Sequence, residues 1–477
     1  MRIPENLLPL ILGFILCTGI SPSLGATAYL AADSGQVVVL NHVALVEVTT
    51  GKIKPDMALV IRGTRIELIA PALQYQPQRD AKVIDLSRHY IIPGFIEMHA
   101  HLLLHPWDVE GNIMPRYDRP ATLAMLRTLL AFGITTVRDP GAPTEAALTF
   151  RDLVAREEIT GPRILTAGRI LNASSFDPEP FAVVTTVQQV RDEIAWQAAA
   201  GVDFIKVYSS MPPDLVQAAI AAAHTHGLRV IGHTQRTTWT EAAVMGIDAL
   251  CHVAPWSPEY LPESQRTDYQ QTLFGRVYWL AHLDLHAPAV EDMIAALVRH
   301  RVALDPTLIA MHSKFWGNDP RYLQHPQSEL APEVFRRGWS KGSFTAGWDT
   351  TQYQAAQAQW PKLLAFTKLL HDRGVLLTVG TDTPTPWIIP GASYHEEMQL
   401  CAEAGIPSKE VLRMATSNAA VALGRENEIG TVAPGKHADL VVLGENPLDT
   451  IQNTQKIALV IKAGKIYEPR LLLQQVH

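Results

Sequence analysis

Between residues 91 and 424 the chain repeats one pattern: an amphipathic helix, a glycine and then an apolar strand. "AMLRTLLAFGITTV" and "LLAFTKLLHDRGVLLTV" both have this form. A helix closed by glycine and followed by a buried strand is the repeating unit of parallel α/β folds. Eight such strands predict an α/β fold, a (β/α)8 TIM-like barrel with enlarged loops. The predicted strands are Ile92–Met98, Ile134–Arg138, Arg163–Ala167, Asp203–Tyr208, Leu228–Gly232, Ile247–Cys251, Val302–Leu304 and Val375–Val379.

The two flanks of this region have a different character. Residues 27–90 and 425–477 consist of short apolar strands with turns, as in "MALVIRGTRIELIA" and "KIALVIKAGKIYE". Such runs favour β-structure. Two β-rich ends around one barrel predict a small composite β-sandwich domain, to which both termini contribute.

Residues 1–26 form a separate segment. Arg2 precedes the apolar run "LLPLILGFILCTGI", and small residues follow up to Ala26. This pattern is typical of a signal peptide, so it predicts an exported protein, periplasmic or secreted, without a stable membrane span after cleavage. A retained membrane anchor is the alternative interpretation of the same run. The mature chain would keep Cys251 and Cys401, which are too few for a disulfide scaffold.

The charge balance excludes one class of partner. The sequence contains 40 Lys and Arg residues against 47 Asp and Glu residues, which gives a formal net charge of −7. Without a long basic run, this composition does not predict nucleic-acid binding, and a small-molecule substrate is the expected partner. The sequence leaves a homo-oligomer open.

Polar side chains gather where the predicted barrel strands end. The carboxyl ends of the strands build the active site in a barrel of this type. Ordinary alternatives exist for each residue: a hydrogen-bonding histidine, an ion pair of Lys206 with Asp382 or Glu97, or a helix cap by Asp382. Their accumulation at one rim favours a metal site instead. The residues are His99, His101, Lys206, His233, His252 and Asp382.

Several motifs resemble those of the amidohydrolase superfamily, specifically its imidazolonepropionase-like and metal-dependent prolidase-like branch. They include "IIPGFIEMHAH", "FIKVY", "VIGHT", "GIDALCHV", "GTDT" and "IGTVAPGKHADLVVLGENPL". The resemblance covers nearly the whole chain after residue 26. It implies two divalent metal ions, with Zn²⁺ the first choice. His99, His101 and Asp382 would bind the more buried ion, and His233 and His252 the more exposed one.

The resemblance also implies a mechanism. Lys206, carbamylated by CO₂, would bridge the two ions together with a hydroxide, which would attack an amide or peptide-like C–N bond. Asp382 would be the catalytic residue that takes the proton from the bridging water and passes it to the leaving group. Imidazole, carboxylate and carbamate are ligands that suit Zn²⁺.

Residues beyond the metal ligands predict the substrate class. Arg236, three residues after His233, is expected to hold a substrate carboxylate, and Tyr208 to add a hydrogen bond. N-acyl amino acids and dipeptides, including those that end in proline, fit this description. Tryptophans that follow strand ends would form an aromatic wall. They are Trp107, Trp256, Trp316 and Trp387.

Two other functions compete with this interpretation. The same metal site would also serve the hydrolysis of a lactone, carbamate or phosphoester. A non-catalytic exported binding protein on the same fold would be expected to lose metal ligands, and none is missing. After strand three the chain reads "AGRILNASSFDPEPF" where many relatives carry a glycine–histidine element. That departure weakens any inference from their substrates.

Overall fold

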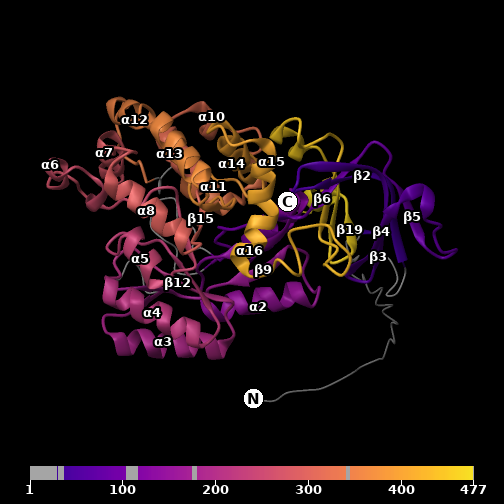
Figure 1. Ribbon diagram of the computed structural model, residues 1–477, viewed down its shortest axis with the longest axis horizontal. Helices are drawn as coiled ribbons and strands as arrows, with labels where there is room; N and C mark the ends of the chain where they lie inside the picture. Colours follow the sequence, from indigo (N-terminus) through magenta and orange to yellow (C-terminus); the bar gives the residue numbers. More distant parts are fainter. Residues whose placement is uncertain (1–28, 31–36, 104–116, 175–179, 340–343, 476–477) are drawn as a thin grey trace, which may run out of the picture.

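The computed structural model describes residues 29–30, 37–103, 117–174, 180–339 and 344–475. Two parts are visible in Figure 1: a barrel of parallel strands enclosed by helices, and a sheet beside it that combines indigo strands from the beginning of the chain with yellow strands from its end. Among the described residues, no helix is long and apolar enough to cross a membrane.

The sheet beside the barrel is built from both ends of the chain. β17 pairs antiparallel with β6, and β1 pairs antiparallel with β19. This pairing confirms that the two β-rich ends come together, whereas their arrangement as a sandwich stays a prediction. Its strands are β1 (Tyr29–Leu30), β2 (Val37–Glu47), β3 (Lys52–Arg62), β4 (Arg65–Pro71), β5 (Lys82–Asp85), β6 (Tyr90–Pro93), β17 (Leu440–Leu443), β18 (Ile457–Lys462) and β19 (Lys465–Tyr467).

Strand β2 shows why this sheet needs so many apolar residues. Val38 and Leu40 pack in one hydrophobic cluster, whereas Val37 and Val39 pack in another. Neighbouring residues of a strand point to opposite faces, so the run "VVVL" buries both faces of the sheet.

The barrel contains all eight predicted strands in parallel order. Main-chain hydrogen bonds close the ring: Asp203 N donates to Thr166 O at 2.9 Å, and Met98 N donates to Val379 O at 3.0 Å. The TIM-barrel-like prediction is therefore confirmed. The strands are β7 (Phe95–Glu97), β8 (Ile134–Asp139), β9 (Arg163–Thr166), β12 (Phe204–Val207), β13 (Arg229–Gly232), β14 (Ala249–Cys251), β15 (Ala303–Asp305) and β16 (Leu376–Leu377).

The first predicted strand, Ile92–Met98, is in fact two strands that belong to different sheets. The break falls at Gly94, whose N–H donates to Asp439 O of the terminal sheet, whereas Phe95 N donates to Gly133 O of the barrel. A Cβ at Gly94 would overlap the Thr135 side chain. Glycine therefore lets the chain leave one sheet and enter the next within a single residue.

Two further short strands, β10 (Ile170–Asn172) and β11 (Phe181–Val183), extend the barrel sheet after β9 and were not predicted.

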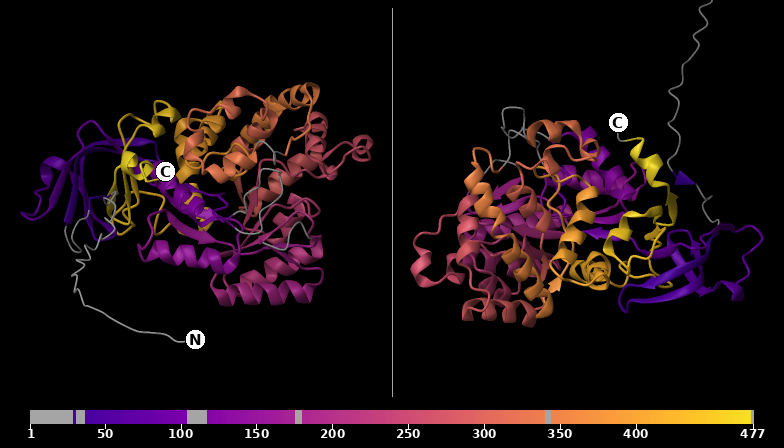
Figure 2. Two further views of the ribbon diagram at one scale, coloured as in Figure 1. Left: turned by 180° about the vertical axis from the view of Figure 1, so that it is seen from behind. Right: turned by 90° about the horizontal axis from the view of Figure 1, so that it is seen from above.

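Helices surround the barrel, as the two views of Figure 2 show. Gly201 and Gly246 end α3 and α5 in the left-handed conformation, as the helix–glycine–strand pattern predicts. The outer helices are α1 (Arg119–Ala131), α2 (Thr144–Ala155), α3 (Val187–Ala200), α4 (Pro213–Thr225), α5 (Trp239–Met245), α8 (Pro288–Arg299), α13 (Trp360–Asp372), α14 (Ala392–Glu403), α15 (Ser408–Arg413), α16 (Ala419–Leu423) and α17 (Pro469–Leu473).

The predicted enlargement of the loops is largest after β14 and β15, where the connecting segments form helices of their own. They are α6 (Glu263–Arg266), α7 (Leu273–His282), α9 (Leu308–Phe315), α10 (Pro320–Leu323), α11 (Glu333–Trp339) and α12 (Thr350–Gln357). Four short 3-10 segments are described as well: η1 (Ala72–Gln74), η2 (Pro258–Tyr260), η3 (Ser328–Leu330) and η5 (Ile451–Gln455). A π-helical segment, η4 (Met414–Asn418), joins α15 to α16.

His395 on α14 makes the stability of this fold depend on pH. Its ring is buried and hydrogen-bonded to the Thr454 hydroxyl and to Phe132 O, and burial lowers the pKa of His395 to about 4. Between pH 6.5 and 4 the unfolded chain therefore binds a proton that the folded chain excludes. Stability is full above pH 6.5 and falls as the pH decreases, by about 2 kcal/mol between pH 7 and pH 5.

We expect the thermal midpoint of the wild type to drop more between pH 7 and pH 5 than that of His395→Gln. The exposed His286 provides the matched control, because His286→Gln should keep the full drop. Equal drops in wild type and His395→Gln would show that another group carries the pH dependence.

Candidate active site

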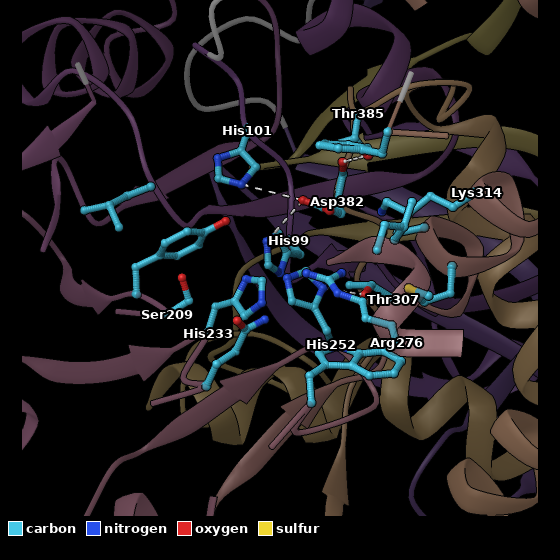
Figure 3. A pocket seen from close by; sticks show the side chains of 18 of the residues that line it. His99, His101, Ser209, His233, His252, Arg276, Thr307, Lys314, Asp382 and Thr385 are labelled. Atoms are coloured by element: carbon cyan, nitrogen blue, oxygen red, sulfur yellow. Dashed lines mark hydrogen bonds and ion pairs between the residues drawn. The ribbon is translucent and has the colours of Figure 1, made fainter. Parts of the chain in front are cut away.

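The polar residues predicted at the strand ends line one cavity of about 510 Å³. Figure 3 shows the four labelled histidine rings together with Asp382 in the middle of this cavity. Their positions follow from the barrel, because the parallel strands all end at the same rim. The residues that the structure brings together there are His99, His101, Lys206, His233, His252 and Asp382.

Three histidines are fixed through their Nδ1 atoms. His99 Nδ1 lies 2.6 Å from Asp305 Oδ2, and His101 Nδ1 lies 3.0 Å from the main-chain oxygen of Gly141. A carboxylate and a carbonyl oxygen accept hydrogen bonds, so both Nδ1 atoms carry the proton and both Nε2 atoms keep a free lone pair. His252 Nδ1 is similarly hydrogen-bonded to the Thr307 hydroxyl at 2.8 Å. Partners of this kind are the usual means by which proteins orient histidines for metal binding.

These lone pairs converge on a carboxylate. His99 Nε2 lies 3.5 Å and His101 Nε2 lies 3.7 Å from Asp382 Oδ1. With Nδ1 protonated in both rings, all three atoms are acceptors, and acceptors so close together repel each other unless a cation lies among them. The ligand atoms of His99, His101 and Asp382 all lie within 4.8 Å of one another. This donor set fits a divalent metal ion.

His233 and His252 form a second pair beside the first. Their ring centroids are 4.3 Å apart, and the His252 ring lies 5.0 Å from that of His99. The buried Nε2 atom of His233 has no hydrogen-bond partner among the described residues. A buried nitrogen without a partner is costly in a folded protein unless a ligand or an ion binds it. This pair therefore fits a second metal ion.

The electrostatic surroundings keep these imidazoles neutral. Burial lowers the pKa of His99, His233 and His252 well below the ordinary value, and Lys206 adds to the effect on each of them. Neutral imidazole is the form that binds metal ions.

Lys206 on β12 does not form the ion pair that would be its ordinary role. Its Nζ donates to Cys251 Sγ at 2.9 Å, and no carboxylate oxygen of the described residues lies within 4.0 Å of Nζ. Glu97 accepts instead from His99 N at 2.8 Å and from Thr381 N at 3.0 Å. Cys251 is buried, as expected for a core residue, and burial raises the pKa of its thiol to about 11. The lysine amine therefore lies in the cavity wall without an anionic partner among the described residues.

Two of these residues have an unusual backbone conformation. The φ angles of His252 and Asp382 are 69° and 67°, in the left-handed region that residues other than glycine rarely adopt. Such strain costs of order 1–3 kcal/mol per residue and tends to occur at functional sites. In this conformation both side chains line the cavity.

Asp305 is a site residue that sequence reasoning missed. It is the last residue of β15 and binds His99 through one oxygen, while its other oxygen lies 2.5 Å from Arg138 Nη2. Burial raises the pKa of Asp305 to about 6, and the Arg138 guanidinium limits that rise. A position at the end of a barrel strand could have identified Asp305 as a site residue. The predicted strand ended at Leu304, one residue too early.

Replacing Asp305 by Asn should lower metal affinity by about 10- to 100-fold, because the neutral amide no longer fixes the His99 tautomer. Competition with a chelator measures this. Asp248→Asn is the matched control, since that carboxylate accepts from Val230 N at the opposite end of the strands. An unchanged dissociation constant in Asp305→Asn would mean that His99 needs no such partner.

The structure brings only part of the predicted substrate-binding set into the cavity. Tyr208 and Trp256 line it. Trp316 instead stacks on His312, with ring centroids 4.2 Å apart, and Trp387 packs against Trp339. Trp107 lies outside the described residues. The four tryptophans therefore do not form one wall in the part of the chain that the structure describes.

Arg236 is exposed and is not among the residues that line the cavity. The reason is local: the chain bends at Gln235 and Arg236, and Gln235 lines the cavity while Arg236 is exposed. The cavity contains two other cations, Arg276 on α7 and Lys314 on α9, which the sequence did not single out. A lysine within the apolar stretch "LIAMHSKF" was the only available signal.

A family model described as Amidohydrolase family matches residues 90–263 and 340–467, more than half of the chain. The protein belongs to the amidohydrolase family. It is 35% identical over 79 residues to an adenine deaminase of Rubrobacter xylanophilus. The matched stretch covers 17% of this chain and 13% of that protein. It is 26% identical over 418 residues to an imidazolonepropionase of Chromobacterium violaceum. This match covers 81% of this chain and 84% of that protein.

A solved structure of a Xaa-Pro dipeptidase with bound methionine in the active site has the same fold. Its TM-score is 0.67 at 19% sequence identity, and the alignment covers 91% of this chain and 100% of that chain. The long imidazolonepropionase match and this structural neighbour agree with the predicted imidazolonepropionase- and prolidase-like branch of the family.

Proposed function

We propose that the protein is a metal-dependent hydrolase that cleaves the C–N bond of an amide or peptide-like substrate. The observation that carries this proposal is the cluster of acceptors formed by His99, His101 and Asp382, which needs a cation. Family membership supports it, and the name of the Xaa-Pro dipeptidase directs attention to dipeptides.

Two divalent ions, with Zn²⁺ the first choice for these ligands, would be held by His99, His101 and Asp382 on one side and by His233 and His252 on the other. Lys206 would bind both after reaction with CO₂: its nitrogen bonds to the carbon, one proton leaves, and the side chain becomes an anionic carbamate. Bound there, the ions would supply Lewis-acid polarisation of a carbonyl and a water of lowered pKa.

The side chains would then position the substrate and move the proton. Asp382 can take a proton from the attacking water on its carboxylate and deliver it to the amide nitrogen as the C–N bond breaks. Burial raises the pKa of the Asp382 carboxyl, and the neighbouring cations Lys314 and Lys206 oppose that rise. The buried cavity wall limits competing water, and Tyr208 lies beside His233, with ring centroids 4.8 Å apart, where its hydroxyl can orient the substrate.

The cavity also supports a substrate class. Apolar side chains such as Ile170, Phe181 and Met311 line it together with the charged residues. Such a mixture suits a substrate with an apolar or aromatic group on one side of the scissile bond and a charged group on the other. N-acyl amino acids and dipeptides, including those that end in proline, have this form.

The test is a turnover screen of zinc-loaded protein with N-acyl amino acids and dipeptides, run beside lactones, carbamates and phosphoesters. We expect hydrolysis of the C–N substrates, and its loss on chelation with recovery on addition of Zn²⁺. Turnover confined to an ester, lactone or phosphoester would assign the site to another bond class. Bound metal without turnover of any substrate would instead favour a binding protein.

We also propose that the protein is exported, periplasmic or secreted, and is cleaved near Ala26. The support is the apolar run followed by small residues in a segment that lies outside the described residues. Mass spectrometry of the mature N-terminus tests this. Intact Met1 on soluble cytoplasmic protein would contradict it.

A further inference from the structure

Two cations lie in the cavity beside the metal ligands. Arg276 and Lys314 both line it, and in Figure 3 they lie on the side away from Ser209, with Asp382 and the histidines between. Among the described residues, no carboxylate oxygen comes within 4.0 Å of either group. Both side chains are partly buried, and Asp382 acts on them only from a longer distance. Partly buried cations without a paired counter-ion are unfavourable, so two of them in a substrate-sized cavity indicate an anionic ligand.

The Arg276 guanidinium is held by the protein rather than by solvent. Its Cζ lies 5.4 Å from the ring centroid of Trp256, in a cation–π arrangement. Trp256 is buried and packs edge-on against Trp279, with ring centroids 5.3 Å apart, and its main-chain oxygen accepts from the Tyr269 hydroxyl at 2.7 Å. Trp256 therefore supports the arginine side chain from one side. Among the described residues, the guanidinium makes no hydrogen bond, so its donors are available to a ligand in the cavity.

Lys314 is carried by a similarly anchored element. The buried Glu397 carboxylate accepts from Leu308 N at 2.9 Å and from Ile309 N at 2.6 Å, which fixes the first turn of α9. Burial lowers the pKa of Lys314 to about 8; Asp382 opposes this shift, and Arg276 contributes to it. The two cations therefore disfavour each other in the free protein, and an anion between them would relieve that repulsion.

We propose that Arg276 and Lys314 bind the free carboxylate of the substrate, so that the enzyme selects amides and dipeptides with an anionic group on the α7–α9 side of the scissile bond. This inference rests on the proposed function for the position of that bond. It assigns to Arg276 and Lys314 the role that the sequence suggested for Arg236, whose side chain is exposed. A planar guanidinium provides two parallel donors for a carboxylate, and the ammonium adds a point charge.

A binding experiment tests the carboxylate site without any bond to cleave. Calorimetry on the zinc-loaded full chain compares 5-phenylpentanoate with 5-phenylpentan-1-ol, which differ in charge but share the aryl chain. We expect the acid to bind at least about 30-fold more tightly, and Arg276→Met to remove about 30-fold of its affinity, as for the loss of one partner of a buried charged pair. Lys314→Met should weaken acid binding in the same direction, and Arg276→Lys should be intermediate.

Matched controls separate the outcomes. Arg337→Met changes an exposed arginine paired with Glu333 on α11 and should leave both affinities unchanged. Metal content and thermal midpoint confirm that each variant is folded. Equal binding of acid and alcohol, acid binding that survives both Arg276→Met and Lys314→Met, or a loss confined to Arg236→Met would each overturn the inference.

Turnover distinguishes this inference from the proposed function. N-acetyl-L-phenylalanine and its C-terminal amide differ only in the carboxylate. Hydrolysis of both at equal rates would leave the hydrolase proposal intact and reject the carboxylate site. A selective acid site in a protein that cleaves neither compound would retain the inference about binding and reject these substrates.

Discussion

Replacing Asp382 by Asn should lower kcat/KM for amide substrates by about 10³- to 10⁴-fold, among the largest effects of any single substitution in this protein. Asn can neither take the proton of the attacking water nor return it to the leaving nitrogen, and general acid–base catalysis typically contributes about 10²- to 10⁴-fold. Loss of the negative charge also weakens the metal site formed with His99 and His101. Steady-state kinetics with the metal content of each preparation measured in parallel is the appropriate test.

The metal measurement separates the two contributions of Asp382. If Asp382→Asn retains two ions per chain and still loses activity, proton transfer is responsible; if the ions are lost as well, ligation contributes. Asp284→Asn, on an exposed residue, is the control. Activity within about tenfold of wild type in fully loaded Asp382→Asn would remove Asp382 from the proton-transfer role.

Lys206→Ala should lose most of one or both metal ions and nearly all activity. The lysine amine faces the cavity next to four histidines and lacks a carboxylate partner among the described residues. Conversion to a carbamate gives this side chain two oxygen donors for two ions, so metal loading of the wild type should be faster in bicarbonate and slower in CO₂-free buffer. Metal analysis after loading under both conditions provides the measurement.

Lys368→Ala offers a matched control, because Lys368 is a surface lysine paired with Asp372 on α13. It should load and turn over like the wild type. Full metal content and activity in Lys206→Ala, or loading of the wild type that ignores bicarbonate, would exclude the carbamate bridge.

Much of the barrel and the positions of the predicted ligands could be predicted because both depend on local patterns. A helix, a glycine and an apolar strand identify the unit, and the polar residue after each strand falls at the common rim. His99, His233 and His252 were found in this way. The break at Gly94 was missed because "IIPGFIEM" reads as one apolar run, and only the packing of Thr135 against Gly94 requires two strands.

Residues that act through distant contacts could not be predicted in this way. Arg276 and Lys314 belong to helices inserted after β14 and β15, and no periodicity says which face of an inserted helix meets the cavity. Arg236 was misplaced for a local reason, since the chain bends there and the sequence pattern does not decide whether Gln235 or Arg236 faces inward. Trp316 and Trp387 pack against other rings, because a place after a strand end does not determine which way a long loop folds.

The single-residue passage from β6 to β7 has a consequence for the order in which the molecule can mature. β6 lies between β2 and β17, so its second neighbour is synthesised only near the end of the chain. Until β17 arrives, the strand that leads directly into His99 and His101 lacks half of its support. The strand before His99 and His101 therefore gains its second neighbour only after the whole barrel has been synthesised. If the centre needs this support to bind its ions, those ions would be taken from the compartment in which β17 docks beside β6.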